Sequence, residues 1–204
     1  MGMRQYGLLI GTGILAGVLL LSGLLFPSRT QFRGSLLDPP LPAPDFSLAQ
    51  ADGTLFTLSA QRGKIVLLFF GYTYCPDVCP TTLADLNAAL KRLGRQSKNI
   101  RVVFISVDPR RDTPQRAQFY ASAFNPGFVG LSGDETELQP IWQAYGVYRL
   151  VRDEESRGKD YLVDHSARVY LIDAQGNLRL TYAFGTPVDD LVNDLRLVLR
   201  DIRP

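Results

Sequence analysis

The two cysteines of the chain lie where a buried strand is predicted to meet a helix. Residues 65–70 are all apolar, which predicts a strand buried on both faces, and residues 82–93 have leucines at helical spacing. Cys75 and Cys79 lie between these elements, in the segment 71–80. If the first helical turn includes both, their separation of four residues places the two sulfurs on one face. They are then close enough to form a disulfide or to bind one small ion.

A purely structural disulfide explains this pair less well than sulfur chemistry does. Closing a loop of five residues would stabilise the fold by only about 2 kcal/mol in the loop-entropy model. A chain of 204 residues is also large enough not to need such a crosslink. The start of a helix favours the thiolate over the thiol, because free backbone N–H groups and the helix dipole stabilise negative charge. The pair is therefore interpreted as chemically active.

The other segments of the chain alternate between strand and helix patterns. Residues 46–48 and 55–58 flank an Asp-Gly turn signal and predict an N-terminal hairpin. Further along, the patterns predict strands at residues 101–107, 128–131, 169–172 and 178–184, and helices at 114–123, 135–145 and 187–202. With right-handed crossovers, this order gives an α/β fold whose mixed sheet is flanked by helices. A cysteine pair after the first central strand of such a sheet is the thioredoxin-like arrangement.

Some side chains receive a structural interpretation from the same patterns. Asp112 or Thr113 is expected to cap the helix that begins at Pro114, and capping accounts for Asp112 without a ligand role. The helix at residues 135–145 is expected to bury three side chains in the core, those of Ile141, Trp142 and Tyr145. Residues 152–160 contain three basic and four acidic side chains, which predicts a solvated loop or hairpin tip.

The amino-terminal part of the chain predicts a membrane anchor. Residues 7–26 contain no charged side chain and would span roughly 30 Å as a helix, the thickness of a bilayer core. A secretory signal peptide has a shorter apolar core and a small-residue cleavage site, so a retained single-pass anchor at residues 1–26 is favoured. The proline-rich residues 27–41 predict a stiff, extended linker. The globular domain is then expected to comprise residues 42–204.

The formal charge of +2 describes the whole chain and not the expected domain. Without Arg4, Arg29 and Arg33, 19 of the 22 basic side chains remain against 20 acidic ones, a net charge of about −1. A nucleic-acid-binding surface is therefore not expected.

His165 is the only histidine, and its position in the predicted sheet makes it a candidate ligand. It precedes the strand at residues 169–172, and in thioredoxin-like folds the loop before this strand lies against the cysteine helix. Generic thiol oxidoreductases of that fold have a cis-proline there, whereas this chain has an imidazole. Two thiolates and one imidazole suit copper, because thiolates select Cu(I) and three ligands satisfy it, while zinc would need a fourth ligand. Oxidation to a disulfide would remove two ligands, so redox state and metal binding should be linked.

Three motifs carry a resemblance to a known family. They are the cysteine segment 71–80, the segment SVDPRRDTP at residues 106–114, and the stretch 164–173 with the sequence DHSARVYLID. In this combination the chain resembles the Sco/SenC family of membrane-anchored copper metallochaperones, which act in cytochrome c oxidase assembly. The resemblance covers about residues 42–203.

The resemblance implies roles for five side chains. Cys75, Cys79 and His165 match the copper ligands of the family, Asp164 matches the acidic neighbour of the histidine, and Asp77 matches the acid between the cysteines. Asp164 is expected either to orient the imidazole or contact a partner, or simply to form a turn. Docking to a partner is the role considered for Asp77.

A metal-delivery protein, not a turnover enzyme, is the function that the resemblance implies. It would deliver copper to the dinuclear copper site of cytochrome c oxidase subunit II or to a similar acceptor, and an upstream copper donor or thiol reductant would serve it. The alternative is a thiol–disulfide oxidoreductase, in which Cys75 and Cys79 reduce the cysteines of the acceptor and His165 is dispensable. A thiol peroxidase is a more distant third interpretation.

The expected location also follows mainly from the family. The short amino terminus lacks the Arg- and Ser-rich character of an organellar transit peptide. We therefore expect a bacterial inner-membrane protein whose soluble domain lies in the periplasm. The alternative is the mitochondrial inner membrane, with the domain facing the intermembrane space.

Overall fold

The computed structural model describes residues 31–152 and 161–201. The predicted membrane span at residues 7–26 lies outside these ranges, as do residues 153–160 of the charged segment. Within the described ranges, no helix is long and apolar enough to cross a membrane. Residues Phe32–Pro204 form one compact unit.

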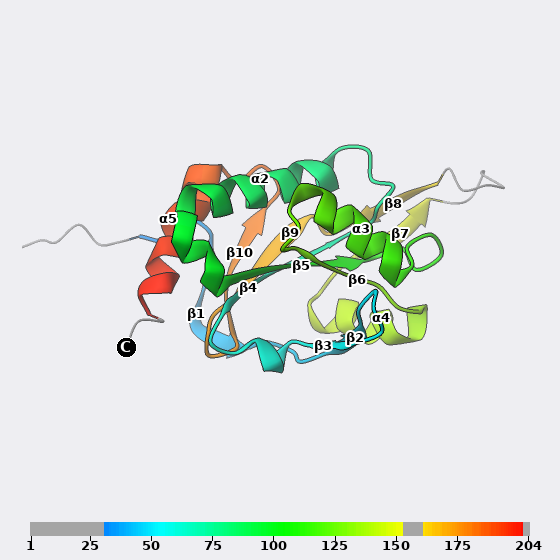
Figure 1. Cartoon of the computed structure of the whole chain (residues 1–204), viewed down its shortest axis with the longest axis horizontal. Coiled ribbons are helices and arrows are strands. Elements are labelled where there is room, and N and C mark those ends of the chain that lie inside the picture. Colours follow the sequence, from blue (N-terminus) through cyan, green and yellow to red (C-terminus); the bar gives the residue numbers. More distant parts are fainter. Residues whose placement is uncertain (1–30, 153–160, 202–204) are drawn as a thin grey trace, which may run out of the picture. The chain divides into compact units, whose positions relative to one another are not determined.

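A six-stranded mixed sheet forms the centre of this unit (Figure 1). β4 lies in its interior, runs parallel to β5 and antiparallel to β9, and is buried at every residue. The predicted buried strand is therefore confirmed, since a strand covered on both faces reads as a continuous apolar run. The strand order is β1, β10, β9, β4, β5, β6, with bounds Ser35–Pro42, Asn177–Ala183, Arg168–Ile172, Ile65–Gly71, Ile100–Ser106 and Val129–Leu131.

Helices cover both faces of the sheet, as the element order predicts (Figure 1). α2 (Val78–Leu93), α3 (Pro114–Phe124) and α5 (Val188–Arg200) lie on one face, where α2 contacts the other two. α4 (Glu135–Ala144) lies on the opposite face. It buries the three side chains assigned to the core, namely Ile141, Trp142 and Tyr145.

The predicted N-terminal hairpin is confirmed and packs with α4. β2 (Ser47–Ala49) and β3 (Leu55–Thr57) pair antiparallel. Phe46 stacks on Phe56, with 5.9 Å between the ring centroids, and its ring also contacts Tyr145. An aromatic cluster therefore joins the hairpin to the end of α4.

The carboxy-terminal elements also follow the predicted pattern. β9 and β10 form an antiparallel hairpin. α5 begins after Pro187 and buries Leu191, Leu195 and Val198 against the rest of the fold. The amphipathic pattern of this helix is therefore a reliable guide to its packing.

The first strand corrects the predicted linker. β1 occupies residues assigned to the proline-rich linker and pairs antiparallel with β10 at the edge of the sheet. Its register shifts between Leu36 and Leu41, across Pro39 and Pro40. Prolines favour an extended backbone and are tolerated at edge strands and bulges, where a missing N–H costs no ladder hydrogen bond. The same composition that predicts a free linker therefore also permits a strand, and the folded domain starts before residue 42.

A separate two-stranded ribbon carries the histidine. β7 (Arg149–Arg152) and β8 (Leu162–His165) pair antiparallel and are not part of the six-stranded sheet. In Figure 1 this ribbon lies at the right-hand end of the domain. Each strand has only four residues, and the sequence analysis did not predict either of them. The predicted loop or hairpin tip falls almost wholly on residues outside the described ranges.

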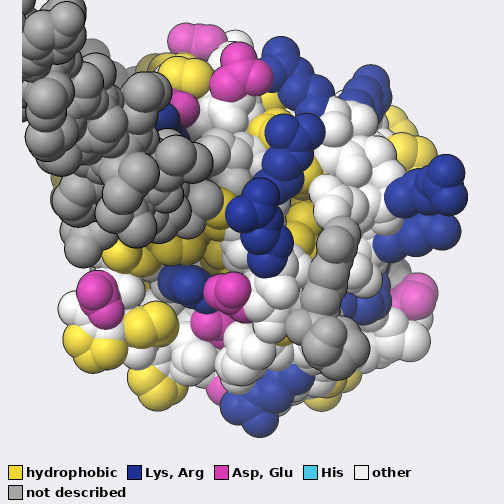
Figure 2. Space-filling view, turned by 90° about the vertical axis from the view of Figure 1, so that its left-hand side faces the viewer, with side chains coloured by type: hydrophobic (Ala, Val, Ile, Leu, Met, Phe, Trp, Pro, Cys, Tyr) yellow, Lys and Arg dark blue, Asp and Glu magenta, His cyan; other side chains and the backbone are white. Residues whose placement is uncertain are grey.

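Positive charge gathers at the end of the domain that carries α5. Figure 2 views this end and shows Lys and Arg side chains in a band down its middle and in a group on its right-hand side. In the sequence, residues 86–107 contain five basic side chains and no acidic one, and they include the carboxyl end of α2. Charge is therefore unevenly distributed, although the net charge of the expected domain is close to zero.

Candidate metal centre

The cysteine loop joins the end of β4 to the start of α2. α2 begins at Val78, four residues earlier than the leucine pattern predicts, so Cys79 lies in its first turn. Cys75 precedes the helix, and its Sγ accepts a hydrogen bond from the backbone N–H of Cys79 at 3.4 Å. Asp77 holds the N-cap position but makes no side-chain cap hydrogen bond. The Cys75 sulfur thus satisfies a free N–H group at the helix start, as the capping side chains of other helices do.

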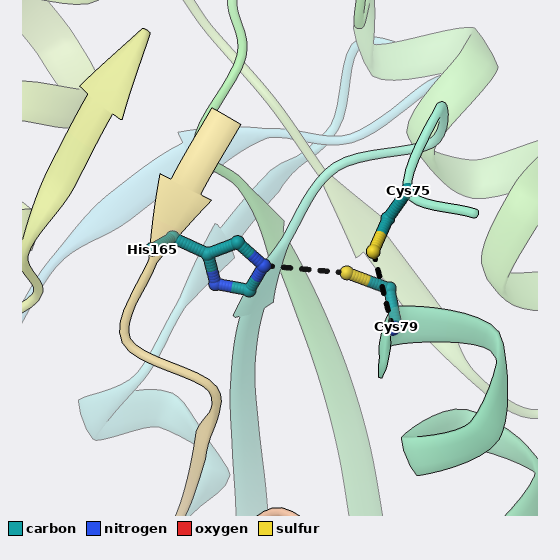
Figure 3. Close-up of side chains that lie close together, drawn as sticks. All are labelled: Cys75, Cys79 and His165. Carbon is teal, nitrogen blue, oxygen red and sulfur yellow. Dashed lines mark hydrogen bonds between the residues drawn. The ribbon is translucent and has the colours of Figure 1, made fainter. Parts of the chain in front are cut away.

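His165 brings its ring to this loop from the end of β8 (Figure 3). Its Nε2 lies 3.4 Å from Cys79 Sγ. One ligand atom from each of Cys75, Cys79 and His165 lies within 4.8 Å of the others, and both cysteines are free thiols. The predicted convergence of two sulfurs and one imidazole is therefore present in the fold.

The hydrogen bond of the other ring nitrogen sets the tautomer of His165. Nδ1 lies 3.2 Å from the backbone carbonyl oxygen of Ser166. A carbonyl oxygen only accepts hydrogen bonds, so Nδ1 carries the proton and donates. In the neutral imidazole the lone pair is then on Nε2, the ring nitrogen that faces Cys79. A neutral imidazole held in this way is the form that binds a metal ion.

The two cysteines differ in their acidity. The hydrogen bond from the Cys79 thiol, followed by bonds from backbone N–H groups, lowers the pKa of Cys75 to about 3 despite partial burial. The hydrogen bond to Cys75, followed by burial, raises the pKa of Cys79. Cys75 is half-buried, whereas Cys79 is completely buried. In the metal-free protein, Cys75 is therefore the accessible thiolate and Cys79 the protected thiol.

Alkylation of the reduced protein is expected to reflect this difference. Iodoacetamide should modify Cys75 alone, at a rate that stays nearly constant between pH 5 and 9 because the thiolate is fully formed across this range. The rate for a free cysteine peptide should rise on the order of a thousandfold over the same range. A thiolate of low pKa is also less nucleophilic, so the absolute alkylation rate is lowered. The test is therefore whether the rate stays constant with pH. Mass spectrometry of the modified peptides measures it, and a rate for Cys75 that climbs with a midpoint above pH 8 would contradict the assignment.

Side chains that the sequence analysis did not single out complete the walls of the site. The Tyr72 ring meets the His165 ring edge-on, with 5.8 Å between centroids, and Phe69 contacts the same imidazole at 6.3 Å. Burial, followed by the nearby Cys75 and Cys79 sulfurs, raises the pKa of Tyr72 to about 12. A Cβ atom at Gly71 would lie only 2.8 Å from Cys79 Sγ. Glycine is therefore required where β4 passes behind the sulfur, and a glycine directly after the apolar run was the available signal.

Asp112 has a different role from the predicted one. Thr113 caps α3 by accepting a hydrogen bond from Arg116 N–H. Asp112 is buried instead, and its carboxylate accepts from the backbone N–H and hydroxyl of Thr73 and from the hydroxyl of Ser106. Burial raises the pKa of this carboxyl, and the bonds from Thr73 and Ser106 oppose the rise. The acid ties the cysteine loop to the end of β5.

A cleft of about 340 Å³ opens beside the three side chains, and both candidate acids line it. Asp77 is exposed on the loop. Asp164 lies in β8, not in a turn, and its carboxylate pairs with Arg152. The Nδ1–H of His165 donates to the Ser166 carbonyl. Neither of the two candidate acids therefore accepts this hydrogen bond.

Comparison with known proteins decides the family. The family model described as SCO1/SenC matches residues 37–200. The chain belongs to the SCO1/SenC family. The resemblance drawn from three motifs is thereby confirmed, and it includes part of β1 as well as the whole metal centre.

Individual members of the SCO1/SenC family support this assignment. Protein SCO1 homolog 1, mitochondrial, from Arabidopsis thaliana is 38% identical over 159 residues, which are 78% of this chain and 47% of that protein. The chain therefore spans about half the length of this relative.

Two solved Sco structures have the same fold. The solution structure of apo Sco1 from Thermus thermophilus is 40% identical, with a TM-score of 0.75 over 84% of this chain and 99% of that one. The crystal structure of Arabidopsis thaliana ScoI, which has copper bound, is 37% identical, with a TM-score of 0.71 over 78% and 98% of the two chains. The mixed α/β fold of this chain is therefore that of Sco proteins.

Proposed function

We propose that the protein is a copper carrier that binds one copper ion between Cys75, Cys79 and His165 and delivers it to an acceptor protein. The observation that carries the proposal is the convergence of the three ligand atoms within 4.8 Å of one another. Two sulfurs and one neutral imidazole nitrogen suit Cu(I) in number and softness. The copper-bound relative from Arabidopsis thaliana supports the choice of metal.

The unequal burial of the ligands suggests how the ion would leave. Cys75 faces the cleft, whereas Cys79 is completely buried behind it. An incoming thiolate of the acceptor would therefore first replace the Cys75–copper bond, and the bonds to Cys79 and His165 would break afterwards. Copper remains Cu(I) throughout, so this exchange needs no electron donor. The freed cysteines can take up protons from solvent.

We also propose the physiological setting that the family resemblance implied. The acceptor is the dinuclear copper site of cytochrome c oxidase subunit II or a similar copper protein, and an upstream donor loads the carrier. Residues 1–26 would anchor the chain in the bacterial inner membrane, with the domain in the periplasm. The apolar sequence of residues 7–26 supports the anchor. An anchor would raise the effective concentration of the carrier near a membrane-bound acceptor.

A second candidate function is favoured by the acidity and exposure of Cys75. An accessible thiolate with a buried thiol four residues later is the arrangement of a thiol–disulfide oxidoreductase. Cys75 would attack a disulfide of the acceptor, Cys79 would then release the mixed disulfide, and two thiols would be oxidised as one disulfide is reduced. This reaction needs no ligand from His165.

Copper titration of the reduced full chain and of a His165→Ala variant separates these functions. The carrier is expected to hold one copper with two sulfur neighbours and one nitrogen, read by X-ray absorption, and the variant should lose the nitrogen and bind at least about tenfold more weakly. Asp164→Asn serves as the matched control, because its carboxylate pairs with Arg152 and not with the imidazole. Copper binding that ignores His165, together with intact disulfide exchange, would favour the oxidoreductase.

A further inference from the structure

The strand that carries His165 is held to the domain by side chains and not by the main sheet. Among the described residues, β7 and β8 pair with each other and with no strand of the six-stranded sheet, and an isolated two-stranded ribbon is marginally stable in water. The ribbon buries Val163 and the preceding Tyr161. Two arginines with little exposure, Arg111 and Arg149, make polar contacts that hold it to other elements of the domain.

Arg111 connects the loop after β5 to the start of β8. Its side chain is 5% exposed and forms an ion pair with the fully buried Asp108. Its guanidinium donates to the backbone carbonyl of Tyr161 at 2.8 Å and lies 3.6 Å from the centroid of the Tyr161 ring. The Tyr161 hydroxyl donates to the same Asp108 at 2.7 Å. Asp108 and Arg111 together therefore hold both the backbone and the side chain of Tyr161, directly before β8 begins.

The same guanidinium also contacts the cysteine loop. It lies 4.7 Å from the ring centroid of Tyr74 and 5.6 Å from that of Tyr72. Tyr72 in turn contacts the ring of His165. Arg111 thus lies between the two parts of the chain that supply the sulfurs and the imidazole.

Arg149 fixes the other strand of the ribbon, at the position paired with His165. Its Nε donates to the backbone carbonyl of Val107, and its guanidinium lies 4.9 Å from the ring of Trp142. Glu135 accepts from it at 3.3 Å, and the side chain is 15% exposed. This contact holds the His165 end of the ribbon to the end of β5 and to α4.

We propose that Arg111 and Arg149 are positioning residues for His165, which fix the β7–β8 ribbon so that the imidazole lies within ligand distance of the cysteines. The inference rests on the proposed copper-binding function. It adds that two residues outside the proposed ligand set determine where the His165 imidazole lies. Each arginine combines an ion pair, a hydrogen bond to a backbone carbonyl and stacking on an aromatic ring. Lysine keeps the charge but provides neither the planar fork nor the stacking.

Lysine variants of the full chain test this proposal, because they keep a positive charge beside Asp108. In apo Arg111→Lys/Arg149→Lys, the nuclear Overhauser effects between the rings of Tyr72 and His165 are expected to disappear, and the single histidine makes these signals easy to assign. Copper should remain bound to two sulfurs without the nitrogen, with affinity about 10- to 100-fold lower. Arg116→Gln is the matched control, since Arg116 lies over the ring of the same Tyr74 and donates to its hydroxyl, whereas its known contacts within the described residues do not involve β7 or β8.

The outcomes separate this proposal from the proposed function. A folded double variant that keeps both the ring contact and the copper–nitrogen bond would overturn the positioning role. If copper in the wild-type chain has no nitrogen neighbour, the three-ligand site is refuted. The contact between the Tyr72 and His165 rings in the apo proteins still tests the positioning role in that case. If the double variant does not fold, Tyr161→Leu, which keeps both arginines and removes the stacking and the hydroxyl, is expected to weaken the same contact. Retention of the contact in that variant would equally overturn the proposal.

Discussion

Serine in place of Cys79 is expected to lower the affinity for copper by more than about 100-fold, beyond the range seen when residues outside the ligand set are changed. Cys79 lies at the centre of the proposed site, because its Sγ faces His165 Nε2 and its backbone N–H donates to Cys75 Sγ. A hydroxyl oxygen is a hard donor with a high pKa and is a poor ligand for Cu(I). The remaining sulfur and nitrogen would leave the ion with two ligands and an open side.

The measurement is competition for Cu(I) with a chelator of known affinity, under anaerobic and reducing conditions. Cys75→Ser is the companion variant and should lose affinity to a similar extent, although its side chain lies at the edge of the cleft. Circular dichroism checks that both variants keep the fold, which is expected because serine is smaller than cysteine. One tightly bound copper in Cys79→Ser would contradict the three-ligand site.

Alanine in place of Asp112 is expected to lower the free energy of unfolding by about 3 to 5 kcal/mol. The carboxylate accepts three hydrogen bonds, and a bond to a charged group contributes roughly 1.5–3 kcal/mol, but the cost of burying the carboxylate offsets part of their sum. Ser106 is completely buried, so water cannot replace its lost acceptor without opening the core. Losses of this size are confined to a few mechanisms, among them the breaking of a buried hydrogen-bond network.

The neighbouring residue provides the control for this prediction. Thr113→Ala removes the actual cap of α3 and should cost about 1 kcal/mol, the usual value for a cap. Chemical denaturation of both variants measures the difference. Equal, small losses would mean that Asp112 acts as a simple cap, which is the interpretation that its sequence position first suggests.

Local patterns predict those elements whose burial follows from neighbours in sequence. The apolar run at β4, the leucine spacing of α2 and the Asp-Gly turn of the first hairpin all specify their structure over a few residues. The convergence of Cys75, Cys79 and His165 could also be predicted, because cysteine and histidine are scarce in this chain and their chemistry is distinctive.

Features that depend on distant contacts could not be predicted in the same way. β1 is a strand only because β10 lies beside it, and the β7–β8 ribbon contacts Arg111 from another segment and the Val107 carbonyl through its own Arg149. Tyr72, Arg111 and Tyr161 are common residue types without a distinctive spacing, so their convergence becomes visible only in the folded chain. Asp112 could cap a helix by its position, but burial gave it another role.

The edge strand β1 also affects the reach of the domain from the proposed membrane anchor. With attachment through residues 7–26, as proposed, only residues 27–31 separate the membrane span from Phe32, where the compact unit begins. Such a tether reaches roughly 20 Å when fully extended, against about 50 Å for a free linker that continued to residue 41. The volume searched would be smaller on the order of tenfold, and the effective concentration beside the bilayer correspondingly higher. In the proposed setting, the amino-terminal edge of the domain would therefore stay close to the bilayer.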